Sequence, residues 1–357
     1  MSASRLLVAA GSLLVVVVLV IAGISLLGND DSTSPEGGPS GDSSSSAPPS
    51  ATPTPPTATR RACAAKPDVT VRSADELEKA LADAKPGQSI HVADGTYAGN
   101  FEIKASGTAK QPIELCGSAK AVLDGGPSDG GYTLHLDGAS YWRIVGISLT
   151  NGQKGLMADQ AVGNVIDGIS VSHTGDEAIH LRNGSTDNVV QNSTVRDTGL
   201  RKVQYGEGIY IGTAQSNWCD VSDCKPDRSD RNVIRDNDVA DTTAENVDVK
   251  EGTSSGKLLD NTFSGAGMKD SDSWVDVKGN SWLIAGNRGS NAPEDGIQVH
   301  QILDGWGRDN VFRDNHLAVD ASGYGINVTK RHDDNVVACS NTARGAAQGL
   351  TTIDCTS

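Results

Sequence analysis

One short strand pattern returns along the chain in the same form: EAIHLR at 177–182, EGIYIG at 207–212, ENVDVK at 245–250, SWVDVK at 273–278, DGIQVH at 295–300 and YGINVT at 324–329. Earlier copies are YTLHLD at 132–137 and GLMAD at 155–159. In each copy one residue separates two apolar residues, as between Ile209 and Ile211 or between Val247 and Val249. This alternation is typical of a β-strand with one buried face.

A second strand-like segment follows the later copies and carries an asparagine at a constant place. The asparagines recur at intervals of 24, 26, 28 and 26 residues: Asn237, Asn261, Asn287, Asn315 and Asn341. A repeat of this length without an intervening helix indicates a solenoid. We therefore predict an all-β, right-handed parallel β-helix, in which the asparagines form a structural ladder. A β-sandwich is the alternative, but it does not predict one residue at the same phase so often.

The N-terminal part of the chain is expected to lie outside this domain. Residues 6–28 are 23 residues without a charge, enough to span a bilayer as a helix. We interpret residues 1–28 as a signal anchor or, alternatively, as a cleaved signal peptide. Residues 29–61 are rich in Ser, Thr and Pro and are expected to form a disordered linker. Either interpretation places the β-helix domain, residues 62–357, on the extracellular face of the membrane or in the medium.

The domain is expected to begin with a short amphipathic helix between Ser73 and Ala84. Ser73 is its predicted N-cap, and Glu76 completes a capping box. Such a helix would cover the first coil of a solenoid, whose apolar interior is otherwise open to water. The repeat is later interrupted by a long segment, residues 213–231, which is expected to shape a site beside it.

All six cysteines follow the apolar segment, and an even number in an exported chain indicates disulfides. The pairing cannot be derived from the sequence, although Cys219 with Cys224 and Cys339 with Cys355 are natural local pairs. A zinc site is the alternative, but no pair of His or Cys has the spacing of metal ligands.

The net charge of −15 disfavours nucleic acid as a partner, because the phosphates would be repelled. We expect a monomer that acts on or binds a polysaccharide or a cell-wall glycan.

The outward residues of the repeated strand gather like charges in neighbouring coils. Because side chains alternate along a strand, Asp248 is expected to stack on Asp276, and Lys250 on Lys278. Like charges directly opposite each other are unfavourable, which favours a functional site over a merely solvated surface. One lysine should lower the pKa of the other, and a lysine of low pKa is a suitable general base.

The residues around this group suggest a metal and a sugar. Dense carboxylates often bind Ca²⁺, so the predicted ligands are Glu245, Asp248 and Asp276. Glu207 lies one coil away. Trp274 is expected to be outward and to stack on a sugar. The remaining candidates for substrate binding extend the same face: Tyr210, His300 and Arg182.

An N-terminal region and a central motif resemble a known family. SADELEKALADAKPGQSIHVADGTY at 73–97, with GTAKQPIEL at 107–115 and VLDGG at 122–126, is similar to the start of chondroitinase B and alginate lyases. ENVDVKEGTSSGKLLDNTF at 245–263 resembles the central motif of that family of β-helix polysaccharide lyases. The resemblance extends from about Ser73 to Asn287.

This resemblance implies a reaction and roles for several residues. In the family, Ca²⁺ neutralises a uronate carboxylate, a lysine removes the C5 proton, an arginine assists, and the glycosidic bond breaks by β-elimination. Glu245 matches a calcium ligand and Lys250 matches the base. The chain departs from the family at Thr243, where the family has a second glutamate ligand, and at Lys278, where it has the arginine.

Three functions follow from these patterns. The first is a calcium-dependent lyase, or a related C5-epimerase, with Lys250 as base and Lys278 assisting. The second is a non-catalytic glycan-binding or cell-wall-associated β-helix protein. The third is a glycoside hydrolase that uses Asp248 and Asp276 as acid and base. Two lysines beside these aspartates favour elimination over hydrolysis.

Overall fold

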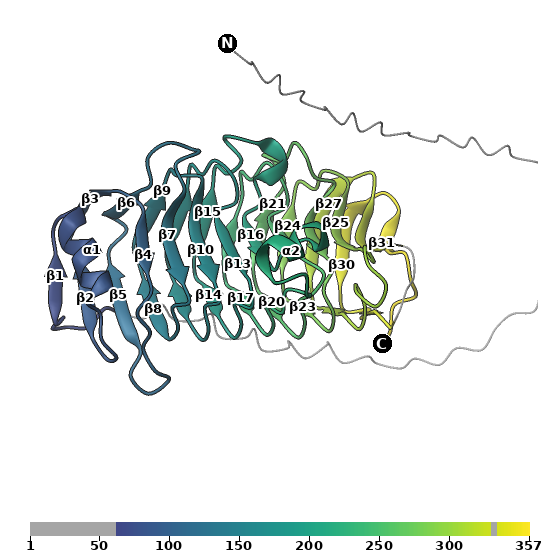
Figure 1. Ribbon diagram of the computed structural model, residues 1–357. Helices are drawn as coiled ribbons and strands as arrows, with labels where there is room; N and C mark the ends of the chain where they lie inside the picture. Colours follow the sequence, from purple (N-terminus) through teal and green to yellow (C-terminus); the bar gives the residue numbers. More distant parts are fainter. Residues whose placement is uncertain (1–61, 330–333) are drawn as a thin grey trace, which may run out of the picture. The chain divides into compact units, whose positions relative to one another are not determined.

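The folded domain is a parallel β-solenoid of about ten coils (Figure 1). The computed structural model describes residues 62–329 and 334–357. The strands form three sheets, here called A, B and C, and successive strands along the chain enter sheets C, A and B in turn. Neighbouring strands of a sheet pair in parallel. The predicted all-β parallel solenoid is therefore confirmed, and the β-sandwich alternative is wrong.

The strands are short, because the chain turns at three corners in every coil. Sheet A consists of β1 (Val69–Val71), β2 (Ser89–Val92), β5 (Ile113–Gly117), β8 (Trp142–Val145), β11 (Val165–Asp167), β14 (Val189–Gln191), β17 (Val233–Arg235), β20 (Lys257–Leu259), β23 (Leu283–Ala285), β26 (Val311–Arg313) and β29 (Val336–Val337). Sheet B consists of β3 (Gly95–Ala98), β6 (Ala121–Asp124), β9 (Ser148–Thr150), β12 (Ser170–Ser172), β15 (Thr194–Arg196), β18 (Asp238–Val239), β21 (Thr262–Ser264), β24 (Arg288–Ser290), β27 (His316–Ala321) and β30 (Thr342–Ala346). Sheet C consists of β4 (Phe101–Ile103), β7 (Tyr132–Asp137), β10 (Lys154–Asp159), β13 (Ile179–Arg182), β16 (Ile209–Ile211), β19 (Val247–Val249), β22 (Ser273–Val277), β25 (Asp295–Val299), β28 (Tyr324–Val328) and β31 (Gly349–Thr351).

Aliphatic side chains fill the interior of the solenoid in stacked rows. In sheet C, Ile209 pairs with Val247, and Val247 pairs with Val275 in the next coil. These three side chains are fully buried. Each contributes about 1.5–3 kcal/mol by leaving water. The apolar pairs identified in the sequence thus point inward, in the register expected for the repeat.

The predicted asparagine ladder is confirmed. The backbone N–H and the Nδ2 amide of Asn261 both donate to Oδ1 of Asn287, each at 3.0 Å. The second Nδ2 proton of Asn261 is donated to the carbonyl of Ile234, in the preceding coil. Asn237, Asn315 and Asn341 are joined in the same way. The ladder satisfies backbone groups at a buried corner where the sheet hydrogen bonds stop.

A second asparagine ladder, which the sequence analysis did not identify, runs along another corner. Asn164 donates from its backbone N–H to Oδ1 of Asn188 at 3.0 Å, and Asn188 donates likewise to Asn232. Asn310 and Asn335 form the same contact near the other end of the solenoid. These asparagines precede strands of sheet A, and their spacing is interrupted by the long segment 213–231, which hides the repeat in the sequence.

The turn before the first ladder explains the recurring Asp-Asn pairs. Asp236, Asp260 and Asp314, which precede ladder asparagines, have φ values of 55°, 53° and 57°. Gly286 takes the same place with φ 69°. Asp, Asn and Gly tolerate this left-handed conformation better than other residues do. The sequence therefore encodes a sharp corner followed at once by a hydrogen-bonding side chain.

A short helix, α1 (Ala74–Ala82), lies at the β1 end of the solenoid (Figure 1). It falls within the segment for which a helix is expected, and Ser73 Oγ accepts a hydrogen bond from the backbone N–H of Glu76 at 3.2 Å. Leu77 and Leu81 on its buried face join the hydrophobic core. The helix therefore packs on β1 and β4 at this end of the domain.

Three disulfides tie the described residues together: Cys63–Cys116, Cys219–Cys224 and Cys339–Cys355. The two local pairs predicted from the sequence are confirmed. None of the cysteines in the described part of the chain is free, so a zinc site built on cysteines is ruled out.

The predicted signal segment, residues 1–28, and the predicted linker, residues 29–61, lie outside the described residues. Within residues 62–329 and 334–357 no helix is long and apolar enough to cross a membrane.

The ladder leads to a stability prediction. Replacing Asn287 with Ala would leave the backbone N–H and the amide of Asn261 without their shared acceptor. Because both donors are buried, we expect a loss of roughly 2–4 kcal/mol in the free energy of unfolding, measured by urea denaturation. Thr262→Ala is the matched control, because its side chain is exposed on the next strand, β21. Equal stability of both variants would contradict a structural role for the ladder.

Candidate functional site

The outer face of sheet C carries three columns of side chains. The in–out alternation of side chains breaks at the start of each strand. Position 208 shows this, because a Cβ added to Gly208 would lie 2.5 Å from Val239 Cγ1 in the core. Position 208 therefore faces inward, as the next residue, Ile209, does. The preceding side chain, Glu207, consequently lies on the outer face with Tyr210. From β13 to β25 the first column is Glu177, Glu207, Glu245, Ser273 and Asp295. The second is His180, Tyr210, Asp248, Asp276 and Gln298, and the third is Arg182, Gly212, Lys250, Lys278 and His300.

A chain of charged contacts joins Lys250 to His300 across three coils. Lys250 Nζ lies 2.5 Å from Asp248 Oδ2. Lys278 Nζ lies 2.8 Å from Asp248 Oδ1 and 2.7 Å from Asp276 Oδ2. Oδ1 of Asp276 lies 3.4 Å from His300 Nε2. The stacked like charges predicted from the register are therefore present, and Asp248 lies between the two lysines.

The pKa values of both lysines lie above their ordinary value, contrary to the expectation from sequence. Burial by itself lowers the pKa of Lys250, but the contact with Asp248 outweighs burial. Burial also lowers the pKa of Lys278, and Asp248 and Asp276 outweigh it; repulsion from Lys250 acts in the expected direction but is weaker. The prediction of a lysine with a depressed pKa is thus wrong, because it left out how closely the carboxylates approach.

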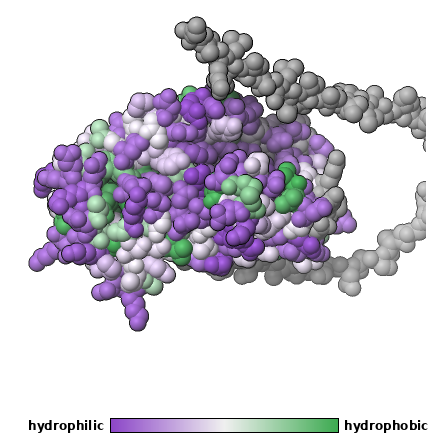
Figure 2. All heavy atoms as spheres, viewed as in Figure 1, coloured by the Kyte–Doolittle hydropathy of each residue, from purple (hydrophilic) through white to green (hydrophobic). Residues whose placement is uncertain are grey.

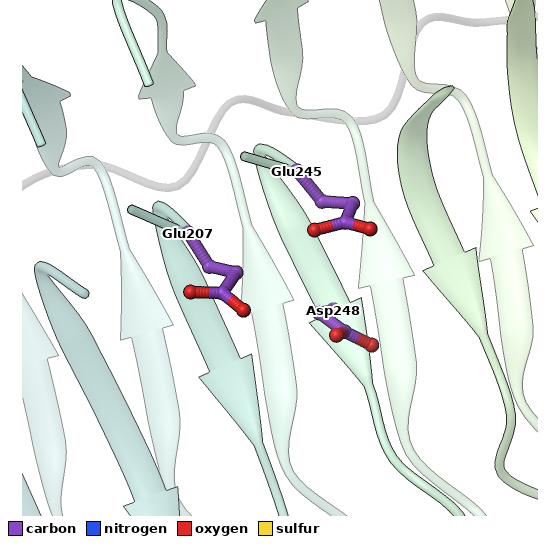
Figure 3. A group of neighbouring side chains, drawn as sticks. All are labelled: Glu207, Glu245 and Asp248. Atoms are coloured by element: carbon purple, nitrogen blue, oxygen red, sulfur yellow. The ribbon is translucent and has the colours of Figure 1, made fainter. Parts of the chain in front are cut away.

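Three carboxylates come together beside Lys250. One oxygen from each of Glu207, Glu245 and Asp248 lies within 4.8 Å of the others (Figure 3). Burial raises the pKa of Glu207 well above its ordinary value, and nearby carboxylates raise it further. Burial, Asp248 and Asp276 raise the pKa of Glu245 to about 8. Within the described residues, Oε2 of Glu207 is buried without a hydrogen-bond partner. Carboxylate oxygens are the ligands that Ca²⁺ prefers, and the unpartnered Oε2 of Glu207 faces this group, so the three side chains fit a hard cation such as Ca²⁺.

The acidic group differs from the predicted ligand set in one residue. Glu245 and Asp248 belong to it, whereas Asp276 lies one coil further and accepts from Ser273 Oγ at 2.9 Å and from Lys278. Glu207 takes the third place. The sequence contained the signal, because Glu177, Glu207 and Glu245 each open a copy of the strand pattern.

A cleft of about 600 Å³ lies over β10, β13 and β16 and reaches Lys250. Lys250 Nζ lies 4.9 Å from the centroid of the Tyr210 ring, and both side chains line the cleft. Burial raises the pKa of the Tyr210 hydroxyl well above its ordinary value, and Asp248 and Glu207 add to this effect. The hydroxyl is therefore protonated at neutral pH. A proton donor and an amine thus stand side by side at one end of the cleft.

The floor of the cleft continues into a buried cluster that sequence reasoning missed in part. His180 Nε2 donates to the carbonyl of Gly212 at 2.9 Å, so that Nδ1 can accept from Lys154 Nζ at 3.3 Å. Lys154 also contacts Glu177 at 2.6 Å. Burial, followed by the charge of Lys154, lowers the pKa of His180, which keeps the imidazole neutral. Lys154 stands just before the apolar strand GLMAD and gave no periodic signal.

The long segment 213–231 borders the cleft, as predicted. It contains η2 (Gln215–Asn217) and α2 (Trp218–Val221), and Asn217 and Val221 are among the residues that line the cleft. The indole of Trp218 donates to the carbonyl of Thr213 at 2.8 Å, and Gln215 donates its backbone N–H to Glu251 at 2.7 Å. The first bond braces the segment internally, and the second holds it against the solenoid, so that it forms a wall of the cleft.

The predicted substrate-binding residues fall into different places. Tyr210 and Arg182 line the cleft, and Arg182 Nε also contacts Asp159 at 2.8 Å. His300 contacts Asp276 and lies outside the cleft lining, as does the predicted catalytic Lys278. Lys278 is nearly buried between two aspartates. It would therefore influence a ligand in the cleft through these carboxylates and not by direct contact.

The prediction that Trp274 is exposed is wrong. Its side chain is fully buried, and its indole N–H donates to the carbonyl of Ser290 at 3.0 Å. A Cβ at Gly289 would overlap the indole ring, and one at Gly296 would lie 2.9 Å from it. Trp274 therefore occupies core space that two glycines leave open. Position 274 belongs to the same corner as Gly208, where alternation fails and two successive residues, here Trp274 and Val275, face inward.

Known proteins resemble this chain in sequence and in fold. Residues 58–198 match the family model described as the Pel9A-like right-handed β-helix region. A pectate lyase, PEL9, of Emericella nidulans is 28% identical over 131 residues, and the match covers 32% of each chain. The chain thus matches about a third of the length of this curated relative.

Two solved structures extend the comparison. The crystal structure of pectate lyase Pel9A is 16% identical, with a TM-score of 0.52, and the match covers 78% of this chain and 75% of that one, which shows a common fold. The alginate lyase from Paenibacillus sp. str. FPU-7 is 35% identical, with a TM-score of 0.75. That match covers 81% of this chain and 98% of the alginate lyase. The chain therefore belongs to the right-handed parallel β-helix family of polysaccharide lyase-like proteins that includes this alginate lyase.

Proposed function

We propose that the domain is a polysaccharide lyase that cleaves a uronate-containing polysaccharide by β-elimination. The observation that carries the proposal is the convergence of Lys250, Tyr210 and the acidic group at one end of a cleft. The similarity to alginate and pectate lyases supports it. The face of the domain seen in Figure 2 is mostly hydrophilic, which suits a polar polymer.

The two cleft residues supply the proton transfers that β-elimination needs. A base must remove the proton at C5 of the uronate, and an acid must protonate the departing glycosidic oxygen at C4. In our proposal Lys250 takes the C5 proton, the C–H electron pair forms the C4–C5 double bond, and the C4–O bond breaks. Tyr210, which is protonated, gives its proton to the leaving oxygen. The unsaturated product absorbs in the near ultraviolet.

A cation at the acidic group would assist this chemistry. Glu207, Glu245 and Asp248 are the residues that would hold it. Bound Ca²⁺ would supply positive charge for the uronate carboxylate and would weaken the attraction of Asp248 for the proton of Lys250. Lys250 would hold its proton less tightly in that environment, which suits its proposed role as the base.

A glycan-binding protein without catalysis is the second candidate, and the raised pKa values of Lys250 and Lys278 favour it. A Lys250 that keeps its proton attracts a polyanion in the cleft and removes protons poorly. A C5-epimerase would share the proton abstraction but would return a proton instead of breaking the bond. Hydrolysis is disfavoured, because Lys278 and His300 hold the pKa of Asp276 below its ordinary value despite burial, so that it does not donate a proton.

The export of the domain, as a membrane-anchored or a secreted protein, is part of the same proposal. An uncharged stretch at residues 6–28 and three disulfides support it.

The first test concerns Lys250. We expect the domain, residues 62–357, to increase the absorbance of alginate or pectate solutions in the near ultraviolet when Ca²⁺ is present. Lys250→Ala should reduce the rate by at least about a hundredfold, because a general base typically contributes this much or more. Lys257→Ala is the control, since this lysine is exposed on the far side of the coil, in β20.

The outcomes separate the candidates. A flat trace for the unmodified domain, with retained binding of the polymer, would leave the glycan-binding candidate. New reducing ends without absorbance would point to hydrolysis, and incorporation of solvent deuterium at C5 without cleavage would point to epimerisation.

The second test concerns the cation. Glu207→Gln removes one charge from the acidic group without changing its shape, and we expect Ca²⁺ affinity, measured by titration calorimetry, to fall at least about tenfold. Ca²⁺ should raise the melting temperature of the unmodified domain more than that of the variant. Glu294→Gln, at an exposed glutamate, is the matched control. Unchanged affinity in Glu207→Gln would remove the acidic group as the cation site.

A further inference from the structure

The cleft has a second wall, formed by the segment Thr198 to Gly206 between β15 and β16. This segment includes η1 (Val203–Tyr205), and Arg201, Gln204 and Tyr205 line the cleft. It is the only part of the cleft lining that presents an exposed large aromatic side chain among the described residues, since Tyr205 is 46% exposed. The proposed reaction assigns no role to this wall.

The wall is attached to the solenoid on both sides. Leu200 and Arg201 donate their backbone N–H groups to the carbonyls of Thr174 and Gly175, at 3.1 and 2.8 Å. Thr243, in the next coil, donates its hydroxyl to the carbonyl of Val203 at 2.8 Å. The segment is therefore pre-organised and loses little entropy when a ligand binds.

The contact with Thr243 depends on two glycines. A Cβ at Gly199 or at Gly206 would overlap Thr243 Oγ1. Gly199 also has φ 72°, a conformation that glycine adopts without strain. Thr243 provides the hydroxyl, and Gly199 and Gly206 leave the space for it. Because three residues far apart in the sequence cooperate in this contact, the position of the wall matters.

Arg201 is oriented by a buried carboxylate. Its guanidinium contacts Asp176, with Nε at 3.1 Å from Oδ1, and Gln153 donates to the same carboxylate at 2.8 Å. The Asp176 side chain is 4% exposed, whereas that of Arg201 is 27% exposed. A guanidinium has five N–H donors, so that Arg201 can hold Asp176 and still bind a carboxylate in the cleft.

Tyr205 supplies a flat apolar surface in the same wall as Arg201. The ammonium of Lys202 lies 5.1 Å from the centroid of its ring, and the ring also lines the cleft. A pyranose has an apolar C–H face that packs on aromatic rings, while its hydroxyl and carboxylate groups point sideways. Tyr205 and Arg201 together therefore match a uronate ring in shape and in charge.

Arg201 lies too far from Lys250 to act on the same sugar ring, and Tyr205 belongs to the wall that joins the two positions. Asp176, which holds Arg201, precedes β13, and Lys250 follows β19, two coils away. Adjacent coils are about 4.8 Å apart, so the separation along the solenoid alone is about 10 Å. One pyranose ring does not span this distance, whereas two or more linked rings do.

We propose that Tyr205 and Arg201 form a distal subsite that binds a second uronate ring of the polysaccharide, with Thr243 positioning the wall that carries them. The inference rests on the proposed function, because it takes the polymer to lie in the cleft. It makes the protein selective for chains with carboxylates on rings beyond the reacting one, and it makes binding depend on chain length.

The test measures affinity for uronate oligosaccharides of two lengths by calorimetry, in the Lys250→Ala background so that nothing is cleaved. We expect Tyr205→Ala and Arg201→Gln each to weaken binding of hexamers about tenfold, and to leave dimers that bind beside position 250 unaffected. Leu200→Ala is the control, because Leu200 is 59% exposed on the same wall but does not line the cleft. In the active protein, Tyr205→Ala should raise KM for long substrates with little change in kcat.

Thr243→Val tests the positioning role, since it keeps the shape of the side chain and removes the bond to Val203. We expect the same preferential loss for hexamers, and Thr243→Ser should restore most of the affinity. Equal affinity of all variants for hexamers, with normal cleavage by the unmodified protein, would overturn the distal subsite alone. Failure of the unmodified cleft to bind or cleave any uronate oligomer would overturn the proposed function, and the subsite with it.

Discussion

The in-register parallel pairing of successive coils is the constraint on which the rest of the structure depends. Each coil repeats the same three strands, and the asparagine ladders fix where each coil turns. Asn261 and Asn287 illustrate this, because one side chain satisfies a backbone and a side-chain donor of the coil before it. Once register is fixed, a position in the repeat becomes a column in space. Any residue type that recurs at one phase is therefore gathered on one face of the domain.

The same constraint explains how much of the site could be predicted. The columns that contain Asp248 and Asp276, and Lys250 and Lys278, followed from a simple period of two. The period fails at the start of each strand of sheet C, where two successive residues face inward. Trp274 was misplaced for that reason, and Glu207 lacked an assigned role for the same reason. The sequence signal for that corner is the column of residues that lies just before the apolar pair in each coil. That column contains Ala178, Gly208, Asn246, Trp274 and Gly296.

The electrostatics of the site lay beyond what the sequence determines. Register shows that two lysines are neighbours, and repulsion alone predicts a lowered pKa. The structure adds distances of 2.5–2.8 Å to carboxylates, and attraction at those distances outweighs the repulsion. The resulting site contains two carboxyls with raised pKa values and two lysines that retain their protons. A cation would lower the pKa values of the two carboxyls and would weaken the hold of Asp248 on the proton of Lys250. Cation binding and the basicity of Lys250 would therefore be coupled through Asp248.

The departure at Thr243 has a physical explanation in this fold. At the position where the resembling family has a glutamate ligand, this chain places a hydroxyl that holds the wall of the cleft. A glutamate there would be too large for the space beside Gly199 and Gly206, and would add a further negative charge near Glu207 and Glu245. Glu207, one coil earlier, completes the acidic group instead. Three carboxylates thus lie together without a glutamate at position 243, and the hydroxyl at that position holds the loop that carries Arg201 and Tyr205. Thr243 stands two residues before Glu245 and holds Val203, so the coil that carries part of the acidic group also positions the wall with Arg201 and Tyr205.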